Sequence, residues 1–127
     1  MSDDDARLAA AGWGGDRTSA FTKGDQLAFA MHLRFDAAAG PAKADAYAER
    51  AMGKLVPALT KSLGKAAIGA ATTLCFDRKQ LGPLLFARKD RELVMLAGPA
   101  KIASGAWASS ATCAVAKRWA DEIIAQP

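Results

Sequence analysis

The most regular pattern in the chain is an alternation between residues 26 and 36. One side of this segment holds the large apolar residues Leu27, Phe29, Met31, Leu33 and Phe35. The other side holds small and polar residues, with His32 and Arg34 among them. A period of two is that of a strand with one buried face. Residues 17–22 precede it across a Lys-Gly-Asp turn at 23–25, so the two segments predict a β-hairpin.

A second hairpin is predicted over residues 81–99, with its turn at Asp90 and Arg91. Between the hairpins, residues 66–76 are ambiguous. They end in residues that favour a strand, Thr-Thr-Leu-Cys-Phe, but they begin with alanine and glycine, which do not.

Helical spacing appears in three other segments. Residues 3–11 open with three aspartates, which suit a helix N-terminus, and Gly12 would cap the end. Residues 42–62 carry apolar residues at every fourth position, and Gly64 should end that helix. Pro57 lies inside it and is expected to kink the helix or split it. A final helix is expected over residues 106–125, with the core stripe Trp107, Ala111, Val115, Trp119 and Ile123.

These elements predict a single α+β domain spanning residues 1–127. We expect an antiparallel sheet of about five strands with two long helices on one face. Each hairpin is followed by a Gly-Pro pair and a long helix, which suggests a ββα–ββα pseudo-repeat.

Positive charge is concentrated in the second part of the chain. Residues 51–127 hold 11 of the 17 Lys and Arg residues but only 5 of the 13 Asp and Glu residues. Such a face could attract anions, and the candidate residues are Lys79, Arg88, Lys89 and Arg91, which would have to cluster with Lys117 and Arg118. The alternative is an ordinary solvated surface. Aromatic residues do not interleave with these charges, which disfavours a nucleic-acid partner.

The two cysteines, Cys75 and Cys113, leave two readings open. They could form one disulfide in an oxidising compartment, or they could be two separate buried thiols. Two isolated cysteines and one histidine make a poor zinc site. No apolar run is long enough to span a bilayer, and the acidic start is not a secretory signal, although export is not excluded.

His32 is the one histidine in the chain and the residue on which an acid–base site would depend. No GxSxG elbow, HExxH motif, calcium loop or nucleotide signature accompanies it. A small enzyme with a site around His32, near Arg34 and Asp36, is therefore kept as an alternative. The sequence indicates no cofactor.

The segment Gly12, Trp13, Gly14, Gly15, Asp16 and Arg17 is the most distinctive stretch of the chain. It lacks the lysine and hydroxyl of a phosphate-binding loop. We expect it to be structural, with Gly12 capping a helix, Trp13 packed inward, and Gly14 and Gly15 turning the chain into its first strand.

This GWGGDR stretch, followed by a hairpin and an Ala-rich helix, resembles a module at the C-terminal end of certain bacterial envelope proteins. Those proteins are poorly characterised and are assigned as zinc metallopeptidases. The resemblance covers residues 8–55, with Asp25 and Asp36 as further matching positions. The family's HExxH motif lies upstream of the module and has no counterpart here, and tryptophans usual in its strand are replaced by Met31, Leu33 and Phe35.

The resemblance implies an exported accessory domain without a metal of its own, and it favours the disulfide. We therefore expect a non-catalytic binding, scaffolding or accessory domain in the bacterial envelope, although a cytoplasmic location stays open. A protein partner or self-association is expected. The alternatives are the His32 enzyme and the anion or nucleic-acid binder.

Overall fold

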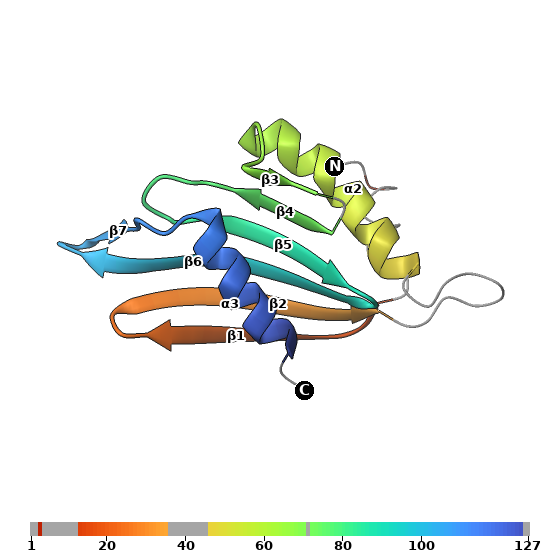
Figure 1. Cartoon of the computed structure of the whole chain (residues 1–127), viewed down its shortest axis with the longest axis horizontal. Coiled ribbons are helices and arrows are strands. Elements are labelled where there is room, and N and C mark those ends of the chain that lie inside the picture. The colour runs from red at the N-terminus through yellow and green to blue at the C-terminus, as the bar shows by residue number, and fades with distance from the viewer. Residues whose placement is uncertain (1–2, 4–12, 36–45, 71, 126–127) are drawn as a thin grey trace.

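The computed structural model describes Asp3 and residues 13–35, 46–70 and 72–125, which form an antiparallel sheet with two helices (Figure 1). The predicted helix over residues 3–11 and the Ala-Gly-Pro connector therefore lie almost wholly outside the described residues. The elements in chain order are β1 (Trp13–Lys23), β2 (Gln26–Phe35), α2 (Ala46–Leu63), β3 (Ile68–Gly69), β4 (Thr73–Phe76), β5 (Leu84–Lys89), β6 (Glu92–Ala103), β7 (Ala106–Ala108) and α3 (Cys113–Ala125).

The sheet has seven strands, which confirms the α+β class and slightly exceeds the expected strand number. Its order is β1-β2-β6-β5-β4-β3, and β7 pairs with β6 beyond this path. Both predicted hairpins form, and β2 pairs with β6 in antiparallel orientation, so the two hairpins lie side by side (Figure 1). The ambiguous segment at 66–76 contributes the short strands β3 and β4.

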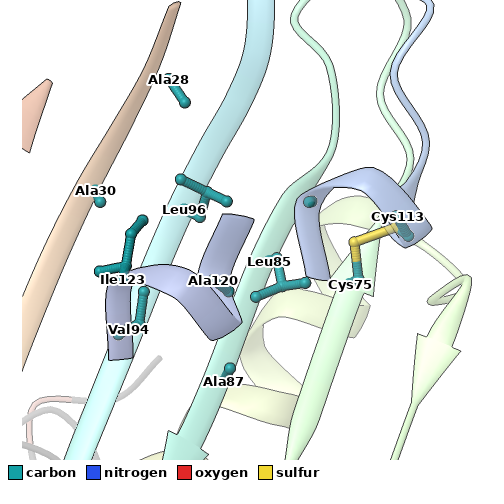
Figure 2. Close-up of a cluster of buried hydrophobic side chains, with 11 residues drawn as sticks. Ala28, Ala30, Cys75, Leu85, Ala87, Val94, Leu96, Cys113, Ala120 and Ile123 are labelled. Carbon is teal, nitrogen blue, oxygen red and sulfur yellow. A yellow bond between two sulfur atoms is a disulfide. The ribbon is translucent and has the colours of Figure 1, made fainter. Parts of the chain in front are cut away.

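The two helices lie on opposite faces of the sheet, which corrects the prediction that both cover one face. α3 packs against a cluster that includes Ala28, Leu85 and Val94. α2 packs against the neighbouring residues Phe86 and Leu93, whose side chains point the other way. Figure 2 shows α3 on the near side of the strands, over Leu85, Val94 and Leu96, with α2 on the far side.

This arrangement also argues against a symmetric ββα–ββα repeat. The element order does contain a hairpin followed by a helix twice. Because β2 and β6 are antiparallel, a two-fold axis relating the hairpins would stand perpendicular to the sheet. That axis would place both helices on the same face, whereas α2 and α3 occupy opposite faces.

The end of α2 agrees with the prediction, its predicted first residues 42–45 lie outside the described residues, and the start of α3 differs from the predicted one. α2 runs through Pro57 as one helix, so of the two expected effects of this proline the split does not occur. Gly64, with a φ of 81°, follows its last residue as predicted. α3 begins at Cys113 instead of residue 106. Ser104 and Gly105, both with positive φ, turn β6 back into β7, because such a pair suits a tight hairpin turn. The buried residues of α3 are accordingly Cys113, Ala116, Ala120 and Ile123.

Gly14 and Gly15 of the GWGGDR stretch lie within a strand, which corrects the prediction that they form a turn leading into it. β1 already begins at Trp13, and its register with β2 shifts between Trp13 and Gly15. Trp13 pairs with Phe35 and Gly15 with Arg34, so Gly14 is the extra residue of a β-bulge. Gly12 and the side chain of Trp13 lie outside the described residues, so the helix cap and the inward packing of Trp13 stay predictions.

The sequence left open whether the two cysteines form a disulfide or are separate thiols, and in the structure they form the disulfide. Cys75 on β4 and Cys113 at the start of α3 are bonded, with their Cα atoms 6.0 Å apart (Figure 2). The bond fixes the N-terminal end of α3 to the sheet, and the buried cluster that includes Leu85, Leu96 and Ile123 holds the rest of the helix.

Candidate functional site

One half of the sheet face that carries α2 is not covered by that helix. β2 shows the change in coverage along its length. Phe35, at its α2 end, has 2% of its surface exposed, whereas Phe29 on the same face has 49% exposed. On the opposite face, Ala28 and Ala30 are buried beneath α3. In this half of β2 the large side chain of Phe29 is therefore less covered than the small ones of Ala28 and Ala30.

The uncovered half contains a shallow apolar hollow of about 220 Å³. Leu81, which is 48% exposed, lies at this hollow together with Phe29. The described residues that line it are Leu27, Phe29, Arg78, Leu81, Ala97, Gly98, Ala100 and Trp107. They come from β2, β6, β7 and the loop between β4 and β5, so the hollow is built from segments far apart in the sequence.

A bulge in β6 forms one part of the hollow. Leu27 pairs with Ala100 and Phe29 with Ala97, so three steps on β6 lie opposite two on β2. Gly98, within the bulge, has a φ of 110°. A Cβ atom there would lie 3.0 Å from the carbonyl oxygen of Leu27, so glycine is what lets the two strands approach this closely.

Hydrogen bonds tie the β4–β5 loop and the segment before α3 to this bulge. Gly98 donates its N–H to the carbonyl oxygen of Pro83 at 2.9 Å. The hydroxyl of Ser109 donates to the carbonyl oxygen of Pro99 at 2.7 Å. A Cβ atom on Gly82 would lie 2.6 Å from that same oxygen, so the loop is packed directly on the bulge. The loop and the bulge that line the hollow are thus held together by hydrogen bonds and close packing.

Arg78 is the one charged residue among the described residues that line the hollow. Its Nε donates to the carbonyl oxygen of Gly82 at 2.9 Å, and its Nη2 makes a longer contact of 3.4 Å with the carbonyl oxygen of Leu81. Within the described residues no carboxylate pairs with this guanidinium. Partial burial lowers the pKa of Arg78 from its ordinary value, because leaving water disfavours the charged form.

His32 lies on the small and polar face of β2 as predicted, but α3 covers that face, and Asp36 of the same hypothesis lies outside the described residues. It lies on the α3 face of β2, opposite Val94, and its Nε2 is 3.2 Å from Oε1 of Glu92 without hydrogen-bond geometry. Its side chain is only 11% exposed, and it lines none of the four hollows described in this section. The histidine thus has a carboxylate neighbour but no adjoining cavity among those hollows in which a substrate could sit.

The four candidate anion-binding residues do not come together. Lys79 lies in the loop before β5, whereas Arg88, Lys89 and Arg91 lie at the far end of that strand. Arg88 and Lys89 do share a hollow of about 300 Å³ with Lys117. Asp121 lines the same hollow and accepts hydrogen bonds from Lys117 at 2.8 and 3.0 Å, which offsets part of its positive charge. Arg91 and Arg118 are not among its described lining residues.

Two further hollows are lined by the described residues. One, of about 370 Å³, lies beside Lys101 and Ser109. The other, of about 240 Å³, lies between β1 and the end of α3, beside Phe21 and Trp119. The first has a mostly polar lining, and the second has charges of both signs, Lys23 and Glu122, whereas the hollow at Arg78 has a single positive charge among its described lining residues.

The residues of the apolar hollow were not singled out from the sequence. Phe29 belongs to the apolar stripe of β2, which is ordinarily the buried face of a strand. One feature of the sequence could have indicated that the other face of this strand is covered by a helix: Ala28 and Ala30 are small enough to lie close beneath one. Arg78 belonged to the basic half but stood outside the candidate set.

Among the described residues no group of three or more His, Cys, Asp and Glu could hold a metal ion. None of the described helices has the length and apolar character needed to cross a bilayer. Comparison of the chain with protein-family models, with curated proteins and with solved structures found no match.

Proposed function

We propose that this chain is a non-catalytic binding domain whose protein partner docks on the uncovered half of the sheet. The observation that carries the proposal is the exposure of Phe29 and Leu81, at 49% and 48%, beside a preformed apolar hollow. Exposed apolar residues that gather around a concave surface are typical of interaction sites, whereas scattered ones are not.

The face of the sheet is a better candidate than its edge. β1 is a long edge strand, and such edges pair with other chains unless they are protected. Arg17 and Lys23 are exposed on β1, and the bulge at Gly14 interrupts its N-terminal part. Charged residues and bulges are the usual protection against edge pairing. A partner is therefore expected to contact Phe29 and the hollow first.

We place the domain in the bacterial envelope or another exported setting. The disulfide between Cys75 and Cys113 supports this assignment, since such bonds persist mainly in oxidising compartments. The GWGGDR resemblance points the same way and suggests an accessory role beside a larger protein.

The two other functions have weaker support. A small enzyme would use the pair formed by His32 and Glu92, which has no hollow beside it among the four described. An anion binder would use the hollow at Arg88 and Lys89, where Asp121 opposes the positive charge.

The proposal is tested by titrating the full chain, labelled with ¹⁵N, with short peptides capped at both ends. The peptides carry Phe, Leu or Trp at their centre, and a Ser peptide is the control. We expect the apolar peptides to shift the indole N–H of Trp107 and the amides of Phe29 and Ala97, and the Ser peptide to leave them unchanged. Equal shifts from all peptides, or none from any, would contradict the proposal.

A further inference from the structure

We propose that the hollow at Arg78 recognises the C-terminal residue of its partner, taking an apolar side chain and the α-carboxylate together. This inference rests on the proposed function, because it specifies the chemistry of the partner that docks there. Two observations support it. The guanidinium of Arg78 has N–H groups that no described residue accepts, and the residues around it are apolar.

The guanidinium of Arg78 retains donors for a ligand. An arginine has five N–H groups, and here Nε and one N–H of Nη2 point to loop carbonyls. No other acceptor within the described residues takes the remaining three. The two loop contacts also hold the side chain in place, so little ordering is needed when an anion arrives.

The charge of Arg78 is uncompensated in an apolar setting. A carboxylate is the natural complement, because a guanidinium binds its two oxygens through parallel hydrogen bonds. Such a pair is stronger where water is partly excluded, and Leu27, Ala97 and Trp107 supply that apolar surrounding. The ligand should therefore be anionic at one point and apolar elsewhere.

The size of the hollow favours a chain end over a larger ligand. Its volume of about 220 Å³ is below the roughly 300–1,000 Å³ of pockets that enclose whole small molecules. It suits one apolar side chain. In a C-terminal residue the carboxylate and the side chain are attached to the same Cα atom, so both can reach one small hollow. The rest of the partner would leave across the exposed surface of Phe29.

The test compares two peptides with the same apolar last residue, Phe, one ending in a carboxylate and the other in an amide. Binding to the full ¹⁵N-labelled chain is followed at the indole N–H of Trp107 and the Nε–H of Arg78. We expect the acid to bind roughly tenfold more tightly than the amide, as one charge-assisted hydrogen-bonded pair would give. The variant R78Q should bring this ratio close to one.

R78Q removes the hydrogen bond from Arg78 to the β4–β5 loop, so a second variant that keeps this bond is also tested. L81D places a carboxylate at an exposed position beside the hollow, so the fold should tolerate it, and it should weaken the acid more than the amide. Octanoate serves as a chain-free apolar carboxylate. Octanoate binding as tightly as the peptide acid would overturn the chain-end assignment.

The other outcomes separate this inference from the proposed function. If acid and amide bind equally and R78Q changes neither, the carboxylate assignment is wrong while apolar docking stands. If neither peptide shifts the hollow but the capped peptides do, the inference alone fails. A tenfold preference for the acid that survives R78Q would also refute the role of Arg78.

Discussion

Cys75 on β4 and Cys113 at the first residue of α3 are joined by a disulfide that closes a loop of 38 residues. The bond links the helix to the sheet at one end of the cluster that includes Leu85 and Val94. Because the bond closes a loop of this length, it removes considerable conformational entropy from the unfolded chain.

Removing this disulfide should lower the free energy of unfolding by about 3–4 kcal/mol, because the unfolded chain regains the entropy of an open loop. Urea denaturation with and without reductant measures the change. The double variant Cys75→Ala/Cys113→Ala is the control, and reductant should not move its midpoint. An unchanged midpoint for the native chain on reduction would contradict this account of α3.

Substitution of the small Ala30 should lower the free energy of unfolding more than substitution of the large Phe29 on the other face of β2. Ala30→Leu is expected to cost about 1–3 kcal/mol, since Ala30 is buried beneath α3 and has no room for a larger group. Phe29→Ser should cost less than about 1 kcal/mol, since the ring is already 49% exposed. Urea denaturation compares the two variants. A larger loss for Phe29→Ser would mean that the ring is buried.

Gly82→Ala tests the packing of the β4–β5 loop on the bulge of β6. Gly82 and Gly64 have similar φ values of 78° and 81°, so alanine is strained by about 1 kcal/mol at either position. At Gly82 the added Cβ would also lie 2.6 Å from the carbonyl oxygen of Pro99, whereas at Gly64 nothing lies within 4 Å. The thermal unfolding midpoint should fall clearly further for Gly82→Ala. Equal shifts would show that the loop does not rest on the bulge.

The hairpins and the first long helix were predictable because their signals are local. Alternation in β2, the turn at Gly24 and the cap at Gly64 depend on neighbouring residues only. The start of α3 was predicted too early, because the apolar spacing around Trp107 could not by itself distinguish a strand from a helix.

The placement of the two helices on opposite faces depends on which strands are apolar on both faces, and this is clear only when the order of the strands in the sheet is known. All four residues of β4 are buried, and on β5 Leu85 and Phe86 are buried on opposite faces. Strands that are apolar on both faces are covered on both. The hollow could not be predicted for a related reason, since it depends on where α2 ends relative to Phe29 and on a bulge in another strand.

The comparison of Phe29→Ser with Ile102→Ser tests docking on the uncovered half of the sheet most directly. Ile102 is more exposed, at 67%, but does not line the hollow, so it controls for the general loss of apolar surface. Titration of both variants with the capped Phe peptide, followed at the indole N–H of Trp107, gives the two dissociation constants. We expect Phe29→Ser to weaken binding several-fold and Ile102→Ser to leave it at the native value. Equal weakening in both variants, or native affinity in Phe29→Ser, would contradict the proposed site.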